Sequence, residues 1–334
     1  GGVALDALTT GNGNTVVGHG AGTGATTGGL NTIVGKDAGA GVLTDAAGHN
    51  LMLGYEAGAS LTSGVRNVLM AGKGAGYSLT SGSDNVFIGH EAGDSHDAET
   101  NNLGIGSSAL GGAIAGGEYN VAIGNNTLDA ITSGDENVAL GYNSSSGLST
   151  GSTNTSIGAG AGASLTTGSG NVLLGHNAGT GSSPGGTINI NDNIMVLGHN
   201  NITYAGIKVA LTVTSDERDK TDIEPFKMGL GFINKLNPVT YRWDMRSNYA
   251  NKTPDGTHKK PELSAGLIAQ DVEKLEREYG YKVEDKTSVI THVSNDGDYS
   301  LTYEKFIPVL INAVQELSAT ITTLQQEINT LKGE

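Results

Sequence analysis

The chain has 334 residues, a formal net charge of −15 with 34 acidic and 19 basic residues, and no cysteine. The length allows two domains, and the missing cysteines exclude disulfides, thiolate zinc sites and a cysteine nucleophile. The few basic residues give no footprint for nucleic acid, and the sequence predicts neither a signal peptide nor membrane insertion.

Glycine content and charge divide the chain near residue 214. Of the 53 glycines, 46 precede Ser215, and that part holds 14 acidic residues but only four basic ones. We therefore predict a Gly-rich β-repeat shaft at 1–205, a connector at 206–214, a compact α+β domain at 215–303 and a coiled-coil helix at 304–334.

The shaft is built from a short repeat, an Asn followed by three mostly apolar or small residues and a Gly. One unit has a short β-prone run, a Gly/Ala corner, a second short run and a Ser/Gly turn. Such a unit cannot bury an apolar face alone, so we expect neighbours to stack into a solenoid with 17 to 19 residues per turn. The clear copies are Asn14–Gly18, Asn31–Gly35, Asn50–Gly54, Asn85–Gly89, Asn120–Gly124, Asn137–Gly141, Asn154–Gly158 and Asn171–Gly175.

A thin solenoid has little interior and long exposed edges, which favours several chains around one axis. We therefore predict a mainly β, homotrimeric fibre, either a trimeric β-helix or a β-roll. The Asn-x-x-x-Gly turns resemble the head repeats of trimeric autotransporter adhesins and the shaft repeats of phage tail fibres.

Two sets of side chains in the shaft are candidates for chemistry. Histidines follow the repeat glycine, and three copies of one around a trimer axis could hold a transition metal; we favour solvated corner residues and expect no metal. Acidic residues cluster where a loop is expected to leave the repeat, and paired carboxylates serve glycoside hydrolysis, but a solvated acidic loop is the simpler reading. The two sets are His19, His90, His176 and His199, and Glu91, Asp94, Asp97 and Glu99.

The second part of the chain has ordinary α+β patterns. Apolar residues at helical spacing predict a helix over 222–236, with Pro225 in its first turn, and another over 266–280. Strands are predicted over 239–243, 289–293 and 299–303, the last two as a hairpin around Asn295-Asp296-Gly297, and a polar loop over 246–263.

The last segment predicts a coiled coil. β-Branched residues repeat every seven positions, and leucines do so three places later, which gives the a and d positions of nearly four heptads. This combination favours parallel dimers in isolated coiled coils, whereas the fibre argument favours a trimer. The heptad residues are Ile307, Val314, Ile321 and Ile328 at a, and Leu310, Leu317, Leu324 and Leu331 at d.

The boundary between the two parts, residues 214–223, is the junction segment and holds the best candidate for catalysis. Ser215 stands five residues before Lys220. A lysine can act as the base that activates a serine hydroxyl if burial or a nearby cation lowers the lysine's pKa. The alternative is a solvated turn in which Ser215 is a helix N-cap.

Four blocks in order strengthen the catalytic interpretation. They are Ser215-Asp216 with Lys220, Asn237–Trp243, Gly266–Glu273, and Leu301–Tyr303 leading into the coiled coil. Together they resemble the intramolecular chaperone auto-processing domain, peptidase family S74. That domain is the last domain of phage tailspikes, tail fibres and endosialidases, and it also occurs in the membrane-tethered myelin regulatory factor.

That resemblance implies self-cleavage of the Thr214–Ser215 bond after trimerisation. Ser215 would be the nucleophile and Lys220 the general base, and Asp216 would either orient the lysine or serve the turn. The resemblance implies no cofactor and no turnover of an external substrate.

The resulting expectation is a phage tail-fibre protein of the virion, assembled in the host cytoplasm. Its shaft would attach to a host-surface receptor, for which tail fibres in general suggest a glycan. A bacterial trimeric adhesin or stalk with a non-cleaving clamp is the alternative. A glycan-degrading tailspike fits less well, since the shaft has few aromatic residues.

Overall fold

The computed structural model describes residues 3–44, 46–113, 115–184, 186–208, 211–294 and 297–333. The chain folds as two compact units, Gly1–Ile202 and Thr203–Glu334.

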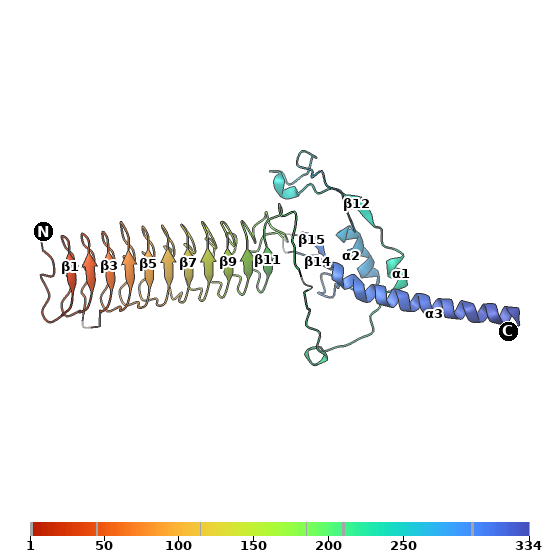
Figure 1. The fold of residues 1–334 in the computed structure, drawn as a ribbon, viewed down its shortest axis with the longest axis horizontal. Helices are drawn as coiled ribbons and strands as arrows, with labels where there is room; N and C mark the ends of the chain where they lie inside the picture. Colours follow the sequence, from red (N-terminus) through yellow and green to blue (C-terminus); the bar gives the residue numbers. More distant parts are fainter. Residues whose placement is uncertain are drawn as a thin grey trace. The chain divides into compact units, whose positions relative to one another are not determined.

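The first unit is a parallel β-solenoid, which confirms the predicted fold class (Figure 1). Strands pair in chain order, and partners such as Thr15 and Thr32 are one repeat apart; between β10 and β11 the spacing widens, with Val172 opposite Met195. Only the first run of each repeat is a strand, and the second forms turns. The strands are β1 (Thr15–Val17), β2 (Thr32–Val34), β3 (Leu51–Leu53), β4 (Val68–Met70), β5 (Val86–Ile88), β6 (Leu103–Ile105), β7 (Val121–Ile123), β8 (Val138–Leu140), β9 (Thr155–Ile157), β10 (Val172–Leu174) and β11 (Met195–Leu197).

A ladder of buried asparagines holds consecutive rungs together. Asn137 is typical: its backbone N–H donates to Asn120 Oδ1 at 3.1 Å, and its Nδ2 donates to the Gly151 carbonyl at 2.9 Å. Its own Oδ1 accepts from the backbone and side-chain nitrogens of Asn154, both at 3.0 Å. Each buried amide is thus satisfied by its neighbours, and the ladder fixes the register of the stack.

The glycine that closes each repeat is required for two reasons. Gly141 has φ +133°, and a Cβ there would lie 2.6 Å from the carbonyl carbon of Gly158 in the next rung. A side chain would therefore be both strained and blocked by backbone.

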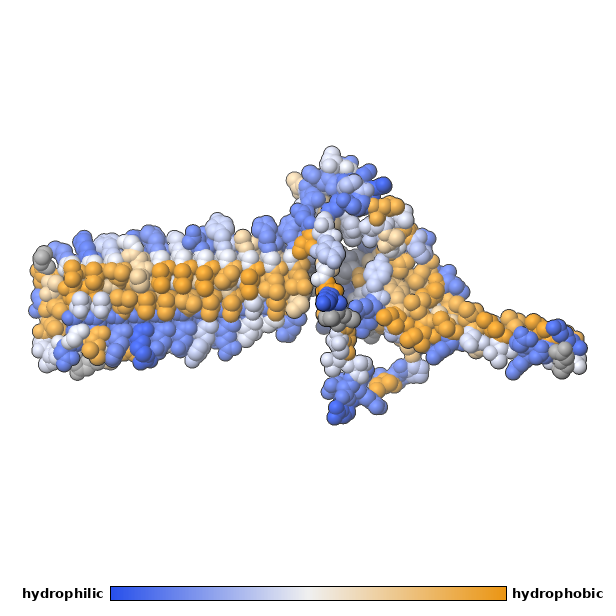
Figure 2. All heavy atoms as spheres, viewed as in Figure 1, coloured by the Kyte–Doolittle hydropathy of each residue, from blue (hydrophilic) through white to orange (hydrophobic). Residues whose placement is uncertain are grey.

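The middle residue of each strand points into the solenoid, while its two neighbours point out. The outward residues are Val, Leu, Ile or Met except for Thr15, Thr32 and Thr155. Figure 2 shows the resulting continuous apolar stripe over the strands. With about 4.8 Å between strands, the stripe is roughly 50 Å long.

The rung that contains Glu91 to Glu99 differs from the other rungs, and its structure is not the one predicted from the sequence. The stretch from Glu91 to Glu99 stays in the solenoid, so the expected departing loop is wrong. Glu99 is buried. Its carboxylate is satisfied there by hydrogen bonds from the backbone N–H groups of Asp97 at 2.8 Å and Gly116 at 3.0 Å. His96 is fully buried at a position that elsewhere holds Leu79 or Ile131.

The second unit is a small α+β structure with a long C-terminal helix. Its core contains Met228, Phe232, Val272, Ile290 and Val309. Strand β12 pairs antiparallel with β13, and β14 with β15. The elements are η1 (Glu217–Asp219), α1 (Leu230–Ile233), β12 (Val239–Tyr241), η2 (Arg246–Asn248), β13 (Ser264–Gly266), α2 (Ala269–Glu278), β14 (Thr291–Val293), β15 (Tyr299–Leu301), η3 (Tyr303–Lys305) and α3 (Phe306–Lys332).

Two predicted helices are shorter than expected. The helix predicted over 222–236 is formed only by α1, because the carbonyls of Phe226 and Met228 accept hydrogen bonds from Asn312 instead of from a helical turn. The helix predicted over 266–280 begins at Ala269, because Gly266 pairs with Val239 in the sheet. The predicted hairpin forms, but Asn295 and Asp296 of its turn lie outside the described residues, as do 209–210 of the connector.

Helix α3 carries the predicted heptads on an open face. All eight a and d side chains are between 44% and 87% exposed, while Phe306, Val309 and Ala313 pack into the unit's own core. By length and composition alone this helix could cross a membrane. Its polar residues, among them Asn312 and Glu316, leave an apolar stripe and not the all-round apolar surface of a membrane span.

Breaking the asparagine ladder should destabilise the shaft. In Asn137→Ala, the Gly151 carbonyl and both nitrogens of Asn154 lose a buried partner, and we expect a loss of about 3 kcal/mol in unfolding free energy, measured by urea denaturation. Ser133→Ala, at an exposed position, is the control and should change stability by less than about 0.5 kcal/mol. Equal stability of the two variants would contradict the role of the ladder.

His96 should make the shaft sensitive to acid. Burial lowers the pKa of His96 from 6.5 to about 3, and neither ring nitrogen has a hydrogen-bond partner. The unfolded chain therefore binds more protons than the folded chain between these values, so stability falls as the pH drops through this range. His96→Leu should remove about 3 kcal/mol of the stability lost between pH 7 and pH 4. Urea denaturation at both pH values measures this, with the exposed His19→Gln as control; an unchanged pH dependence in His96→Leu would refute it.

Candidate active site

The junction segment brings Ser215 and Lys220 into contact. Asp216 caps η1 by accepting a hydrogen bond from Arg218 N at 2.9 Å, and the backbone N–H of Lys220 closes the turn by donating to the Glu217 carbonyl at 3.1 Å. The lysine side chain folds back, so that its Nζ donates to Ser215 Oγ at 2.6 Å and to the Ser215 carbonyl at 3.2 Å. This is the distance that a nucleophile and its base require.

Asp216 serves the turn and its neighbouring arginine. Its carboxylate oxygens lie 2.7 and 3.0 Å from the Arg218 guanidinium, whose hydrogen bonds lower the pKa of Asp216. Within the described residues Asp216 has no hydrogen bond to Lys220. Of the two roles considered for Asp216, the geometry corresponds to the turn residue.

The Ser215–Lys220 pair is open to solvent. Thr214, Ser215 and Lys220 are all exposed, as are the described residues from 203 to 225 apart from the partly covered Asp216. A cavity of about 310 Å³ in the same unit is lined by Leu236, Ile268 and Leu275 among others, and no junction residue borders it. Within the described residues of a single chain, the pair therefore lies on an exposed segment.

The chain after the junction is held by α3. Asn312 Nδ2 donates to the carbonyls of Phe226 at 2.9 Å and Met228 at 3.1 Å. The Glu316 carboxylate accepts from Leu230 N at 2.8 Å. These three contacts fix the backbone path between the junction segment and α1.

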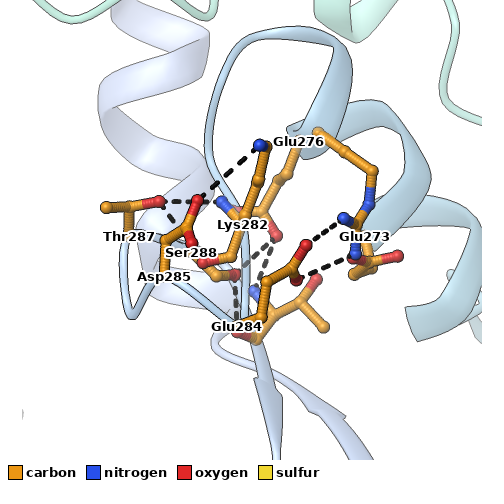
Figure 3. Close-up of polar contacts among 9 residues, drawn as sticks. Glu273, Glu276, Lys282, Glu284, Asp285, Thr287 and Ser288 are labelled. Atoms are coloured by element: carbon orange, nitrogen blue, oxygen red, sulfur yellow. Dashed lines mark hydrogen bonds and ion pairs between the residues drawn. The ribbon is translucent and has the colours of Figure 1, made fainter.

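A buried carboxylate organises a second part of this unit, around α2 (Figure 3). Glu276 of α2 is fully buried and accepts from the backbone nitrogens of Val289 and Ile290 at 2.8 Å and of Thr291 at 2.9 Å. Ser288 Oγ donates to the same carboxylate at 3.1 Å. Glu276 therefore joins α2 to the segment that enters β14.

A surface ion-pair group lies beside Glu276. Arg277 bonds both Glu273 and Glu284, and these hydrogen bonds raise the pKa of Arg277 and lower that of Glu284. Glu276 is not among the residues predicted from the sequence, although its position four residues after the core residue Val272 places it on the buried face of α2.

Within the described residues of a single chain, the histidines and acidic residues of the shaft are not gathered into one site. His19, His90 and His176 are exposed, and the rings of His176 and His199 lie with their centroids 5.8 Å apart. No group of three potential metal ligands occurs among the described residues. Asp94 has a raised pKa because it is partly buried, and Glu99 is occupied by backbone amides.

Comparison with known proteins gives one match. No curated protein and no solved structure matches the chain. Residues 215–281 match the family model described as the chaperone of endosialidase, Peptidase S74. The match begins at Ser215 and ends before β14, so the hairpin and α3 lie outside it. The part of the chain that begins at Ser215 is therefore similar to the chaperone of endosialidase family.

Proposed function

We propose that this chain is a subunit of a homotrimeric fibre whose C-terminal unit drives assembly and then releases itself by cutting the Thr214–Ser215 bond. The observation that carries this proposal is the 2.6 Å contact between Ser215 Oγ and Lys220 Nζ at the first residue of the family match.

The proposed chemistry needs only these two side chains and water. A neutral Lys220 amine accepts the proton of Ser215 Oγ as that oxygen attacks the Thr214 carbonyl carbon. The Thr214–Ser215 C–N bond then breaks, the nitrogen leaves with the proton returned by Lys220, and an ester joins Thr214 to Ser215 Oγ. Water hydrolyses this ester, leaving a carboxylate on Thr214 and a free Ser215 hydroxyl.

Two uncovered apolar surfaces support self-association. The open heptad face of α3 needs partner helices. The apolar stripe along the solenoid is continuous, whereas a monomeric protein usually exposes apolar residues singly. Every copy of this chain carries the same stripe with the same repeat. The strands of one copy can therefore face the strands of another one to one. The similarity to the chaperone family favours three copies over two.

Assembly also explains how the exposed pair would become active. Removing water from a lysine favours its uncharged form, which is the form that can take a proton. In the proposed mechanism the partner chains cover the junction segment, so cutting follows trimerisation. The cut then makes assembly irreversible and leaves the shaft kinetically trapped.

We further propose that the fibre is a phage tail fibre, assembled in the host cytoplasm and carried on the virion, whose shaft attaches to a host-surface receptor. The solvent exposure of Ser215 and Lys220 favours one alternative, a surface adhesin or stalk in which the same unit remains as a non-cleaving clamp.

The cleavage itself can be tested on the full chain. Wild type should give fragments ending at Thr214 and starting at Ser215, whereas Ser215→Ala and Lys220→Ala should remain whole, as seen by denaturing gel and intact mass. Glu217→Ala, an exposed residue of the same turn, is the control and should be cut. If wild type forms trimers that stay whole, self-cleavage is refuted and the C-terminal unit acts only as a non-cleaving clamp.

Cleavage should require the heptad face. Leu324→Lys places a charge at a central d position, and we expect light scattering to show monomers and the cleaved fraction to fall at least tenfold. Gln326→Lys adds the same charge on the outer face of α3 and should assemble and cut normally. Normal cutting by monomeric Leu324→Lys would contradict the proposed order of events.

A further inference from the structure

The segment that carries Ser215 and Lys220 has one fixed end within its own unit. From residue 203 to 225 the described residues are exposed apart from the partly covered Asp216, and the first side chain that is fully buried is that of Met228. Lys220 lies six residues before Phe226, so even a fully extended chain keeps it within about 20 Å of that point. The fixed end therefore limits where the catalytic pair can lie.

That fixed end is attached to α3, the helix that would associate with the α3 helices of other chains. Asn312 and Glu316, both on α3, bind three backbone groups of residues 226–230 at 2.8 to 3.1 Å. Because the partners are main-chain atoms, these contacts fix the path of the backbone and not the position of one side chain.

The same helix uses different faces for the two tasks. Asn312 is five residues after Ile307 and Glu316 two after Val314, which are heptad positions f and c. Neither residue belongs to the a and d face. Replacing them therefore leaves the associating surface intact.

We propose that Asn312 and Glu316 are positioning residues that link assembly of the α3 helices to the location of Ser215 and Lys220. When three α3 helices associate, the three fixed ends take defined places around the common axis, and each junction segment is held against its neighbours. This inference rests on the proposed self-cleavage. It predicts variants that assemble normally but cut slowly.

Substitutions at both residues separate positioning from stability. Asn312→Asp has the same shape but turns a carboxylate oxygen toward two carbonyl oxygens, and we expect cleavage at least tenfold slower. Glu316→Ala removes the acceptor for Leu230 N and should be about fivefold slower, whereas Glu316→Gln retains an acceptor oxygen and should cut within about twofold of wild type. Gln315→Ala, the exposed neighbour, is the matched control.

Gly229 provides an independent test of the Glu316 contact. Its backbone angles, φ −150° and ψ −136°, lie outside the regions that residues with a side chain usually adopt, and a Cβ there would lie 2.1 Å from Glu316 Oε1. Gly229→Ala should therefore displace the carboxylate and slow cleavage as Glu316→Ala does. Adding Gly229→Ala to Glu316→Ala measures the effect of backbone strain alone, because the Glu316 contact is already lost. A slowing by Gly229→Ala that is equally large in both backgrounds would mean that strain, and not the contact, is responsible.

The experiment follows cleavage of the full chain over time by gel, with trimer content from light scattering and thermal unfolding measured in parallel. Slow cutting by normal trimers, rescued by Glu316→Gln, supports the inference. Wild-type rates in Asn312→Asp and Glu316→Ala overturn it, and so does loss of trimers, which would make both residues part of the clamp. If wild type itself is never cut, the proposed function fails, and this inference fails with it.

Discussion

Apolar surface that the chain cannot cover by itself is the constraint on which the rest of this structure depends. In the solenoid, period-two alternation turns the middle residue of every strand inward and leaves two columns of Val, Leu, Ile and Met facing out. In α3, Phe306, Val309 and Ala313 use one face for the unit's own core, while the heptad residues remain open. Each unit has its own buried core and also leaves a continuous apolar surface exposed, and burying that surface against other chains would add stability.

The two uncovered surfaces differ in how well they define register. The asparagine ladder fixes rungs within a chain, but the stripe repeats almost unchanged from β1 to β10, so a partner displaced by one rung would meet nearly the same side chains. The outward threonines, Thr15, Thr32 and Thr155, and the wider spacing before β11 are the main irregularities of the stripe. The stripe therefore favours association between chains but defines their register only weakly. A short helix with few heptads at one end can supply the register, because its ends and its attached unit are unique.

The sequence predicted those features that depend on local periodicity. The solenoid follows from Asn-x-x-x-Gly spacing, α3 from its heptads, and β14 and β15 from alternation around a turn. It failed where tertiary contacts override a local pattern: Asn312, 86 residues from Phe226, prevents the helix expected over 222–236, and Glu99 is held in the solenoid by Gly116 N. Ser215 and Lys220 were named from spacing and family resemblance, and the folded turn of η1 explains physically how five residues of separation place them 2.6 Å apart. Their exposure could not be predicted, since no local pattern around them indicates whether the segment packs against the rest of the unit.

The exposure of the pair and the position of its fixed end have one physical explanation under the proposed function. A self-cleaving bond must survive synthesis and folding of its own chain, so an active arrangement inside a monomer would cut before the shaft had aligned. Placing Ser215 and Lys220 on an exposed segment keeps them solvated, which disfavours the neutral lysine. Tethering that segment through Asn312 and Glu316 to the non-heptad faces of α3 makes its surroundings depend on partner helices. Chemistry then waits for assembly without any dedicated inhibitor, because the groups missing from the monomer are the other chains.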